Sequence, residues 1–114
     1  MTLGNILEMK IIKLADVHRG WFIGDFEPSV LKTKDFEVGV LEHKKGEDWP
    51  AHIHEHCTEY NVLLKGKMSI QKKEINVGDI FIIEKNEIAD PVFHEDCTVV
   101  VVKTPSVRGD KKEV

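Results

Sequence analysis

The sequence lacks a long block of one charge and a long uninterrupted apolar run. Sixteen Lys and Arg residues stand against twenty Asp and Glu residues, a net charge of −4, and neither sign gathers in one segment. Nucleic-acid binding needs a clustered basic surface, so we expect no nucleic-acid partner. No apolar stretch approaches the roughly 20 residues that cross a bilayer as a helix, so we expect no membrane association either.

The sequence is also poor in cysteine and lacks the apolar core of a signal peptide. Glu8, Lys10 and Lys13 interrupt the apolar residues of the first fourteen positions. Two cysteines, Cys57 and Cys97, fit a reducing cytosol better than a disulfide framework, so we expect a cytoplasmic protein with two free thiols. For Cys57, burial as a small apolar residue competes with a role as a soft metal ligand.

What the sequence contains instead is a succession of short apolar runs between turn residues. No window keeps helical periodicity over three turns, which favours an all-β barrel or sandwich. The expected strands lie at 10–14, 36–43, 59–65, 67–71, 74–77, 80–83 and 99–102. The unbroken apolar run at 80–83 indicates burial on both faces. Lys72 and Lys73 are poor residues for a tight primed turn, which favours a loop longer than two residues at that point.

The length of 114 residues allows one hydrophobic core and excludes two ordinary domains. We therefore expect residues 1–114 to form a single domain. Residues 1–9 and 105–114 are expected as peripheral ends, and the polar tail at 105–114 as a loosely ordered one.

The most informative motif is His52-Ile53-His54, followed by Glu59. Two imidazoles separated by one residue lie on the same face of an extended strand, because side chains alternate with period two. A carboxylate returning on the next strand can complete a metal-binding corner. Two neutral imidazoles and one carboxylate suit divalent first-row metals and leave positions open for water or substrate. The competing interpretation is a pocket that holds no metal.

Gly46, His52, His54, Glu59 and Gly66 have the spacing of the first motif of the cupin superfamily, which this sequence resembles at all five positions. The resemblance implies an all-β fold, a small double-stranded β-helix barrel of the jelly-roll type. It also implies a pocket at one mouth of the barrel.

Residues 78–93 resemble the second cupin motif less completely. The family pattern has proline, glycine, histidine and asparagine where this sequence has Glu84, Asn86, Ala89 and Phe93. Ala89 therefore stands in the place of the usual fourth metal ligand.

The resemblance implies that His52, His54 and Glu59 hold one divalent transition metal, namely Fe, Mn, Ni or Zn. Asp90 and His94 are the candidates for the missing fourth ligand or for contacts with a bound substrate. Asp90 would turn inward through a one-residue bulge. An aspartate before a proline is otherwise a common turn pair, and His94 can equally belong to a solvated polar turn.

Further candidates surround this motif. Asn61 shares strand parity with Glu59 and is expected to face the interior, where it either orients a ligand or satisfies a backbone group. Trp49 is placed to shape the entrance of the site or to cap the barrel. His18 and His43 have no supporting spacing and are expected on the surface.

Sugar derivatives and small carboxylic acids are the ligands that the resemblance implies, so we expect a small-molecule ligand. Three function classes stay open. The first is a metal-dependent enzyme of the isomerase, epimerase or dioxygenase type, and the second is a non-catalytic binding or regulatory module. The third is a metal-free enzyme like the sugar ketoisomerases among cupins, with the paired histidines as acid and base. The exposed edge of the N-terminal strand favours a homodimer.

Overall fold

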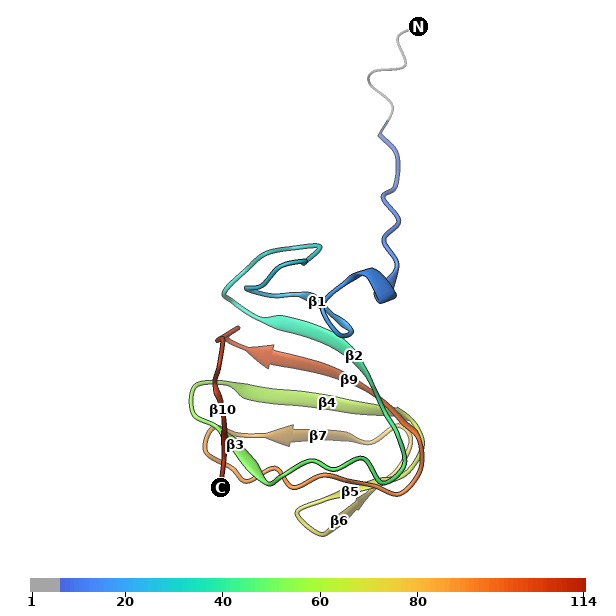
Figure 1. Ribbon diagram of the computed structural model, residues 1–114, viewed down its shortest axis with the longest axis vertical. Coiled ribbons are helices and arrows are strands. Elements are labelled where there is room, and N and C mark those ends of the chain that lie inside the picture. The colour runs from blue at the N-terminus through green and yellow to red at the C-terminus, as the bar shows by residue number, and fades with distance from the viewer. Residues whose placement is uncertain (1–6) are drawn as a thin grey trace, which may run out of the picture.

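The computed structural model describes residues 7–114, and these are built almost entirely of β-strands (Figure 1), which confirms the all-β expectation. In chain order the elements are the 3-10 helix η2 (Leu14–Asp16) and the strands β1 (Trp21–Ile23), β2 (Glu37–His43), β3 (His52–His54), β4 (Thr58–Lys65), β5 (Met68–Ile70), β6 (Lys73–Ile75), β7 (Ile80–Ile83), β8 (Val92–Phe93), β9 (Cys97–Thr104) and β10 (Lys111–Glu113). None of the described elements is a helix long and apolar enough to cross a membrane.

The larger wall of the barrel is a five-stranded sheet in the order β1-β2-β9-β4-β7. Its central strand β9 pairs with β2 on one edge and with β4 on the other. Along β9 the burial alternates, so that Cys97, Val99 and Val101 lie in the core while the residues between them face outward. This alternation is the period-two signature of a strand with one face on a core.

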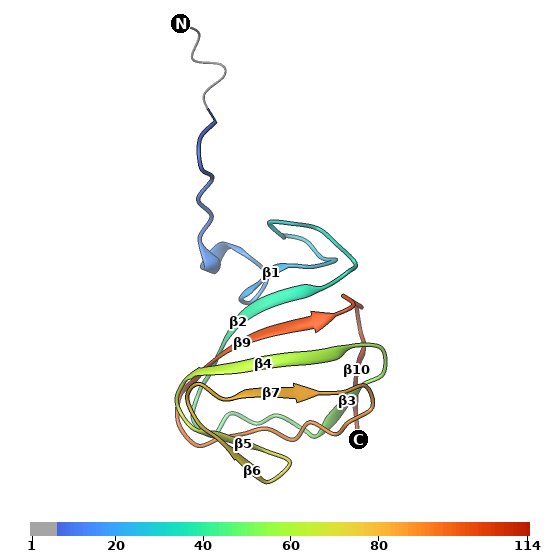
Figure 2. The ribbon, with the colours of Figure 1, turned by 180° about the vertical axis from the view of Figure 1, so that it is seen from behind.

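The opposite wall consists of the pair β10-β3 and the three-stranded sheet β6-β5-β8 (Figure 2). The apolar core between the walls consists of Leu63, Met68, Ile70, Ile75, Ile83, Ala89, Phe93, Cys97, Val99 and Val101. Gly66 turns the chain between β4 and β5 with φ +91°, and a Cβ there would lie 2.3 Å from the carbonyl oxygen of Asp96. The last glycine of the motif is therefore required by backbone conformation and by close packing.

The C-terminal tail is not the loosely ordered end that its polar composition suggested. Residues 111–113 form β10, which pairs antiparallel with β3. Asp110 is buried, and its carboxylate accepts hydrogen bonds from the backbone N–H groups of Glu55, His56 and Cys57 and from Nδ1 of His56. Polar residues are ordered here because their partners are backbone groups of the turn after β3, which composition alone does not reveal.

The expected first strand at 10–14 is also absent. Residues 7–13 are extended and unpaired within the chain, and η2 begins at Leu14. Figure 1 shows this segment running away from the barrel, and we call residues 7–13 the N-terminal arm. The part of the peripheral N-terminal end at 1–6 lies outside the described residues.

Two local expectations about strands and turns are corrected. β5 and β6 are joined by a two-residue turn in which Gln71 and Lys72 both have positive φ, 52° and 60°. β7 is buried on one face only, because Ile80 and Ile82 are 73% and 50% exposed. Its apolar run therefore reflects an apolar outer face of the sheet as well as the core.

We predict that Asp110→Asn lowers the free energy of unfolding by about 2 to 3 kcal/mol near neutral pH, since several buried donors lose a charged acceptor. Hydrogen bonds from His56, Cys57 and the backbone outweigh burial and hold the pKa of Asp110 below its ordinary 3.8. Its contribution is therefore present above that value and lost as the pH falls through the folded-state pKa.

The measurement is urea unfolding of the wild-type protein and of Asp110→Asn, made at neutral pH and at pH values below 3.8. Glu113→Gln, an exposed position on β10, the strand that follows Asp110, serves as the control. Equal stability of Asp110→Asn and wild type at pH 7 would show that the carboxylate does not hold the tail.

Candidate functional site

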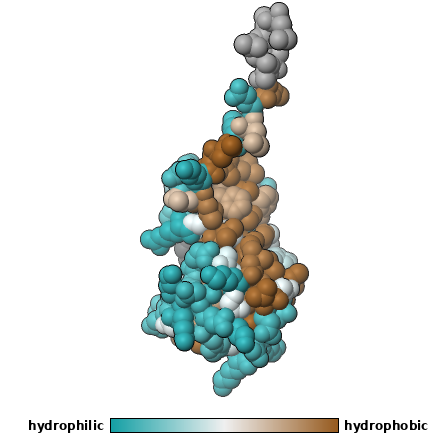
Figure 3. Space-filling model, turned by 90° about the vertical axis from the view of Figure 1, so that its right-hand side faces the viewer, coloured by the Kyte–Doolittle hydropathy of each residue, from teal (hydrophilic) through white to brown (hydrophobic). Residues whose placement is uncertain are grey.

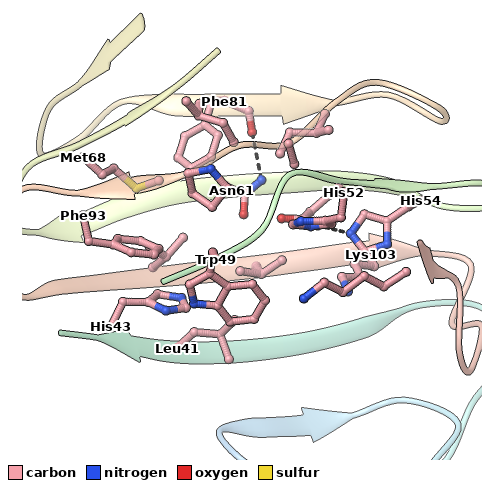
Figure 4. Close-up of a pocket in the computed structure, with 18 of the residues that line it drawn as sticks. Leu41, His43, Trp49, His52, His54, Asn61, Met68, Phe81, Phe93 and Lys103 are labelled. Atoms are coloured by element: carbon pink, nitrogen blue, oxygen red, sulfur yellow. Dashed lines mark hydrogen bonds and ion pairs between the residues drawn. The ribbon is translucent and has the colours of Figure 1, made fainter. Parts of the chain in front are cut away.

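A cavity of about 180 Å³ opens at one end of the barrel between its two walls. Figure 4 shows Met68 and Phe93 toward one end of the cavity and His52, His54 and Lys103 toward the other. The apolar part includes Met68, Ile70, Phe81, Phe93, Val99 and Val101, and the polar part includes His52, His54, Glu59, Asn61, Lys103 and Lys111. His52, His54 and Glu59, the three polar residues of the first motif, therefore line the polar end of one cavity, which we call its mouth.

His54 and Glu59 are in direct contact, with Nε2 of His54 3.3 Å from Oε2 of Glu59. Nδ1 of His52 lies 3.0 Å from the carbonyl oxygen of Pro50, an arrangement in which Nδ1 carries the proton and Nε2 has a free lone pair. The rings of His52 and His54 meet edge to face with centroids 5.2 Å apart. Burial lowers the pKa of His52, which favours the neutral imidazole that metal ligation needs.

Nδ1 of His54 is buried and has no hydrogen-bond partner. His54 also belongs to a group with Cys57 and Asp110 whose possible ligand atoms all lie within 4.8 Å of one another. Among residues 7–114, His52, His54 and Glu59 do not form so tight a group. The structure thus offers a His, Cys and Asp cluster beside the predicted corner, and His54 is common to both.

Charged side chains form a row across three neighbouring strands at the mouth. The register places Glu37 of β2 opposite Lys103 of β9, and Lys103 opposite Glu59 of β4. Burial raises the pKa of Glu37 despite the nearby Lys103 charge. Burial would raise the pKa of Glu59 as well, but the contact with His54 and the charge of Lys103 lower it overall, so this carboxylate is ionised.

Two lysines at the mouth rest on indole rings. The ammonium group of Lys103 lies 4.9 Å from the ring centroid of Trp21, and that of Lys111 lies 3.9 Å from the centroid of Trp49. Trp21 packs over Gly39, where a Cβ would come within 2.7 Å of the indole. Burial lowers the pKa of Lys111. Both tryptophans therefore line the cavity and contact a cation.

The other predicted inward residues lie where strand parity placed them. Asn61 is 3% exposed and faces the cavity, and its Nδ2 donates to the carbonyl oxygen of Phe81 at 3.4 Å. Trp49 lines the cavity, and its Nε1 donates to Glu47. His43, expected on the surface, also lines the cavity, stacked on Phe93 with centroids 4.2 Å apart.

Asp90 and His94 do not line this cavity. His52 and Ala89 exchange both backbone hydrogen bonds, so there is no bulge here and Ala89 is the residue that faces inward. Asp90 instead accepts a hydrogen bond of 2.6 Å from the backbone N–H of Gln71, which supports the positive-φ turn between β5 and β6. His94 is exposed and contacts Ser69.

Two site residues, Lys103 and Lys111, were missed by sequence reasoning. Lys103 shares strand parity with Val99 and Val101, so the alternation along this strand could have placed it inside the barrel. Lys111 gave no such signal, because its segment has the composition of a solvated end.

No protein-family model matches this sequence, and no curated protein sequence matches it. Its structure, however, resembles solved structures. A double-stranded β-helix protein from Klebsiella pneumoniae has a TM-score of 0.66 and 22% identity, with 75% of each chain covered. A cupin-2 domain protein from Shewanella frigidimarina has a TM-score of 0.53 and 15% identity, covering 66% of this chain and 76% of that one.

Oxalate oxidase in complex with the substrate analogue glycolate gives a TM-score of 0.59 at 19% identity. The match covers 70% of this chain and 46% of that enzyme chain. At these identities the likeness establishes the fold. The chain has the double-stranded β-helix fold of the cupins, which confirms the fold implied by the first motif.

We predict that both cysteines of the folded protein react slowly with a thiol-specific disulfide reagent at about pH 8, because the thiolate is the reacting form. Both are buried and free, burial raises the pKa of Cys57 to about 12, and burial raises the pKa of Cys97 as well. The measurement is the time course of thiol release with and without denaturing urea. Two thiols should react rapidly only in urea, and a fast native phase would contradict the burial of these groups.

Proposed function

We propose that this protein is a metal-binding cupin that uses the barrel cavity for a small polar metabolite, with His52, His54 and Glu59 holding one divalent transition metal. The observation that carries the proposal is the 3.3 Å separation between Nε2 of His54 and Oε2 of Glu59 inside the cavity. Two ligand atoms that each lie about 2.1 Å from one ion, with a ligand–metal–ligand angle of about 90 to 109°, are about 3.0 to 3.4 Å apart. Nε2 of His54 and Oε2 of Glu59 are therefore already separated by the distance expected of two atoms that bind the same ion.

His52 supplies the third ligand through its Nε2. Its Nδ1 faces the Pro50 carbonyl, and a backbone oxygen of this kind is the usual partner that orients a metal-bound imidazole. The three ligand atoms are not all within 4.8 Å of one another, so these side chains would have to come closer together to hold one ion. Ala89 carries no donor atom, so the protein contributes three ligands and leaves the remaining positions to water or substrate.

The neighbouring group of His54, Cys57 and Asp110 is a poorer site for an ion. A carboxylate has about four lone-pair positions. Asp110 already accepts from three backbone N–H groups and from Nδ1 of His56, so an ion there would displace bonds that hold the tail. We assign this cluster to the attachment of β10 rather than to the metal.

A bound ion of this class supplies a Lewis acid or an oxygen-binding centre, the chemistry of the isomerase, epimerase and dioxygenase types. The chain's own groups bind and orient the ligand. Asn61 presents an amide to the cavity, and the Trp49 ring lines its wall. Oxalate oxidase, with glycolate bound, is an enzyme built on the same fold, which supports a small carboxylic acid as one ligand class.

A non-catalytic binding module is the second candidate function, and one observation favours it. Asp90 and His94 lie outside the cavity, so neither is available there as a general base. The metal-free ketoisomerase-like alternative requires His52 and His54 to exchange protons with substrate directly, and it predicts function without any ion.

We expect the purified protein to bind about one equivalent of Fe, Mn, Ni or Zn, and the His52→Ala/His54→Ala double variant to lose this binding, because two of three ligands are removed. Elemental analysis after metal loading and dialysis is the measurement. His94→Ala is the control, since this histidine lies outside the cavity.

Cys57→Ser separates the two metal sites, and it should retain the ion. His52→Ala alone removes a ligand of the proposed site only, because His54 belongs to both groups. Loss of the ion in Cys57→Ser together with retention in His52→Ala would move the site to the cluster at Asp110. Failure of all four metals to bind the wild-type protein would refute the proposal.

A further inference from the structure

The two lysines at the cavity mouth have no carboxylate partner. Across residues 7–114, no acidic group comes within 4.0 Å of the ammonium of Lys103 or Lys111, although other exposed lysines do form such pairs. Glu37 and Glu59 flank Lys103 across the sheet, and Glu113 follows Lys111 on β10, all beyond ion-pair distance. Two ammonium groups therefore line one cavity without a carboxylate in direct contact.

The indole rings hold these ammonium groups in place and leave hydrogen-bond donors free. A lysine ammonium that lies on the face of an indole ring keeps N–H groups that do not point at the ring. Because the lysine side chain is already held against the ring, it loses little conformational entropy when a ligand binds. Glu59 is engaged with His54. Glu37 also lies beside Lys103, so the two lysines offer free N–H donors rather than an excess of positive charge. A divalent ion bound at the same corner would add positive charge next to these donors.

The inner cavity has the opposite character. Its lining of Met68, Phe93 and Val99 offers no charge and favours an alkyl group. The geometry points to a ligand with an anionic head at the mouth and a short apolar body inside, and we propose that Lys103 and Lys111 form the subsite for a carboxylate. This proposal rests on the cavity being the ligand site of the proposed function.

Butanoate and its neutral isostere butanamide test this subsite. Binding is followed by tryptophan fluorescence, since Trp21 and Trp49 are the only tryptophans and both lie beneath the lysines, and by calorimetry. A charged hydrogen bond contributes about 1.5 to 3 kcal/mol, so wild type should prefer butanoate by about 10-fold or more.

Lys103→Met and Lys111→Met each remove the charge and keep an apolar stem on the indole. Each should reduce the preference for butanoate about 10-fold and leave butanamide binding unchanged, which also shows that the cavity is intact. Lys112→Met is the matched control, because Lys112 is the next residue on β10 and pairs with Glu55 outside the cavity.

Absence of saturable butanoate binding, equal binding of acid and amide, or an equal effect of Lys112→Met would overturn the proposal. The same titrations are made with chelator-treated and with metal-loaded protein. A lysine-dependent preference that persists without metal supports this subsite even if the metal site fails. A preference that needs metal and ignores the lysines refutes the subsite and leaves the metal site standing.

A second, independent observation concerns the outer face of the five-stranded sheet. Its outward residues on four adjacent strands are uncharged at the centre, namely Val38, Val40, Tyr60, Val62, Ile80, Ile82, Val100 and Val102. Ile80 and Ile82 are at least half exposed, and β7 pairs only with β4, so its other edge is open. An apolar face beside a free edge marks an interaction surface.

The N-terminal arm carries the complementary feature. Leu7, Met9 and Ile11 alternate with Glu8 and Lys10, which is a strand pattern, yet the arm is in none of the strand pairs formed by residues 7–114. Leu7 and Ile11 are 96% and 79% exposed. Figure 3 shows apolar side chains along one side of the body and continuing up to the arm.

We infer that the occupant of this face is a second copy of the chain, whose own face and arm are equally apolar. Four strands about 4.8 Å apart give a face only about 15 Å wide. The arms extend the contact toward the roughly 800 Å² that each partner of a stable dimer buries. Burial of both features in one symmetric interface explains why they occur together.

Light scattering coupled to size exclusion tests the dimer. Wild type should have the mass of two chains, and Ile82→Asp should be monomeric because it would bury an unpaired charge. Val92→Asp is the matched control, since Val92 on β8 is 49% exposed on the other wall. Ile11→Asp, in the arm, should weaken the dimer. A monomeric wild type, or equal dissociation by Val92→Asp, would overturn the inference.

Discussion

The pairing of β3 with β10 is the interaction on which the site depends. β3 has three residues, and it is bound by β10 on one side and by the backbone bonds between His52 and Ala89 on the other. The Asp110 carboxylate joins this arrangement to the turn after β3. Because the register sets Lys111 opposite His54, the pairing of β3 with β10 places a metal-ligand candidate beside a lysine of the proposed anion subsite.

The central strand β9 determines the chemical gradient of the cavity. Its inward residues change from Val99 and Val101 to Lys103, and those of the neighbouring strand β4 change from Leu63 to Asn61 and Glu59. Since antiparallel partners share a face, the apolar ends meet at the bottom and the charged ends at the mouth. A ligand with an alkyl body and an anionic head matches this gradient, and so does an ion held at the mouth.

The fold and the inward side chains of the central motif were largely predictable, because strand parity and fixed motif spacing are local properties. Asn61 and Leu63 face inward and Tyr60 outward as parity requires. The errors arose where long-range partners decide the structure. Asp90 supports the turn at Gln71 instead of entering the cavity, and the polar tail at 105–114 is ordered by donors more than 50 residues away. Neither partner can be identified from local composition.

The run at 80–83 was interpreted as buried on both faces, and in a single chain only its inner face is covered. The arm likewise has a strand pattern without a strand partner. Both discrepancies have one physical cause if residues 80–83 and the N-terminal arm contact a second copy of the chain. Their apolar side chains would then be buried in the dimer although they are exposed in the monomer. The barrel interior would serve the ligand, and its exterior face the partner, through the same period-two alternation of β4, β7 and β9.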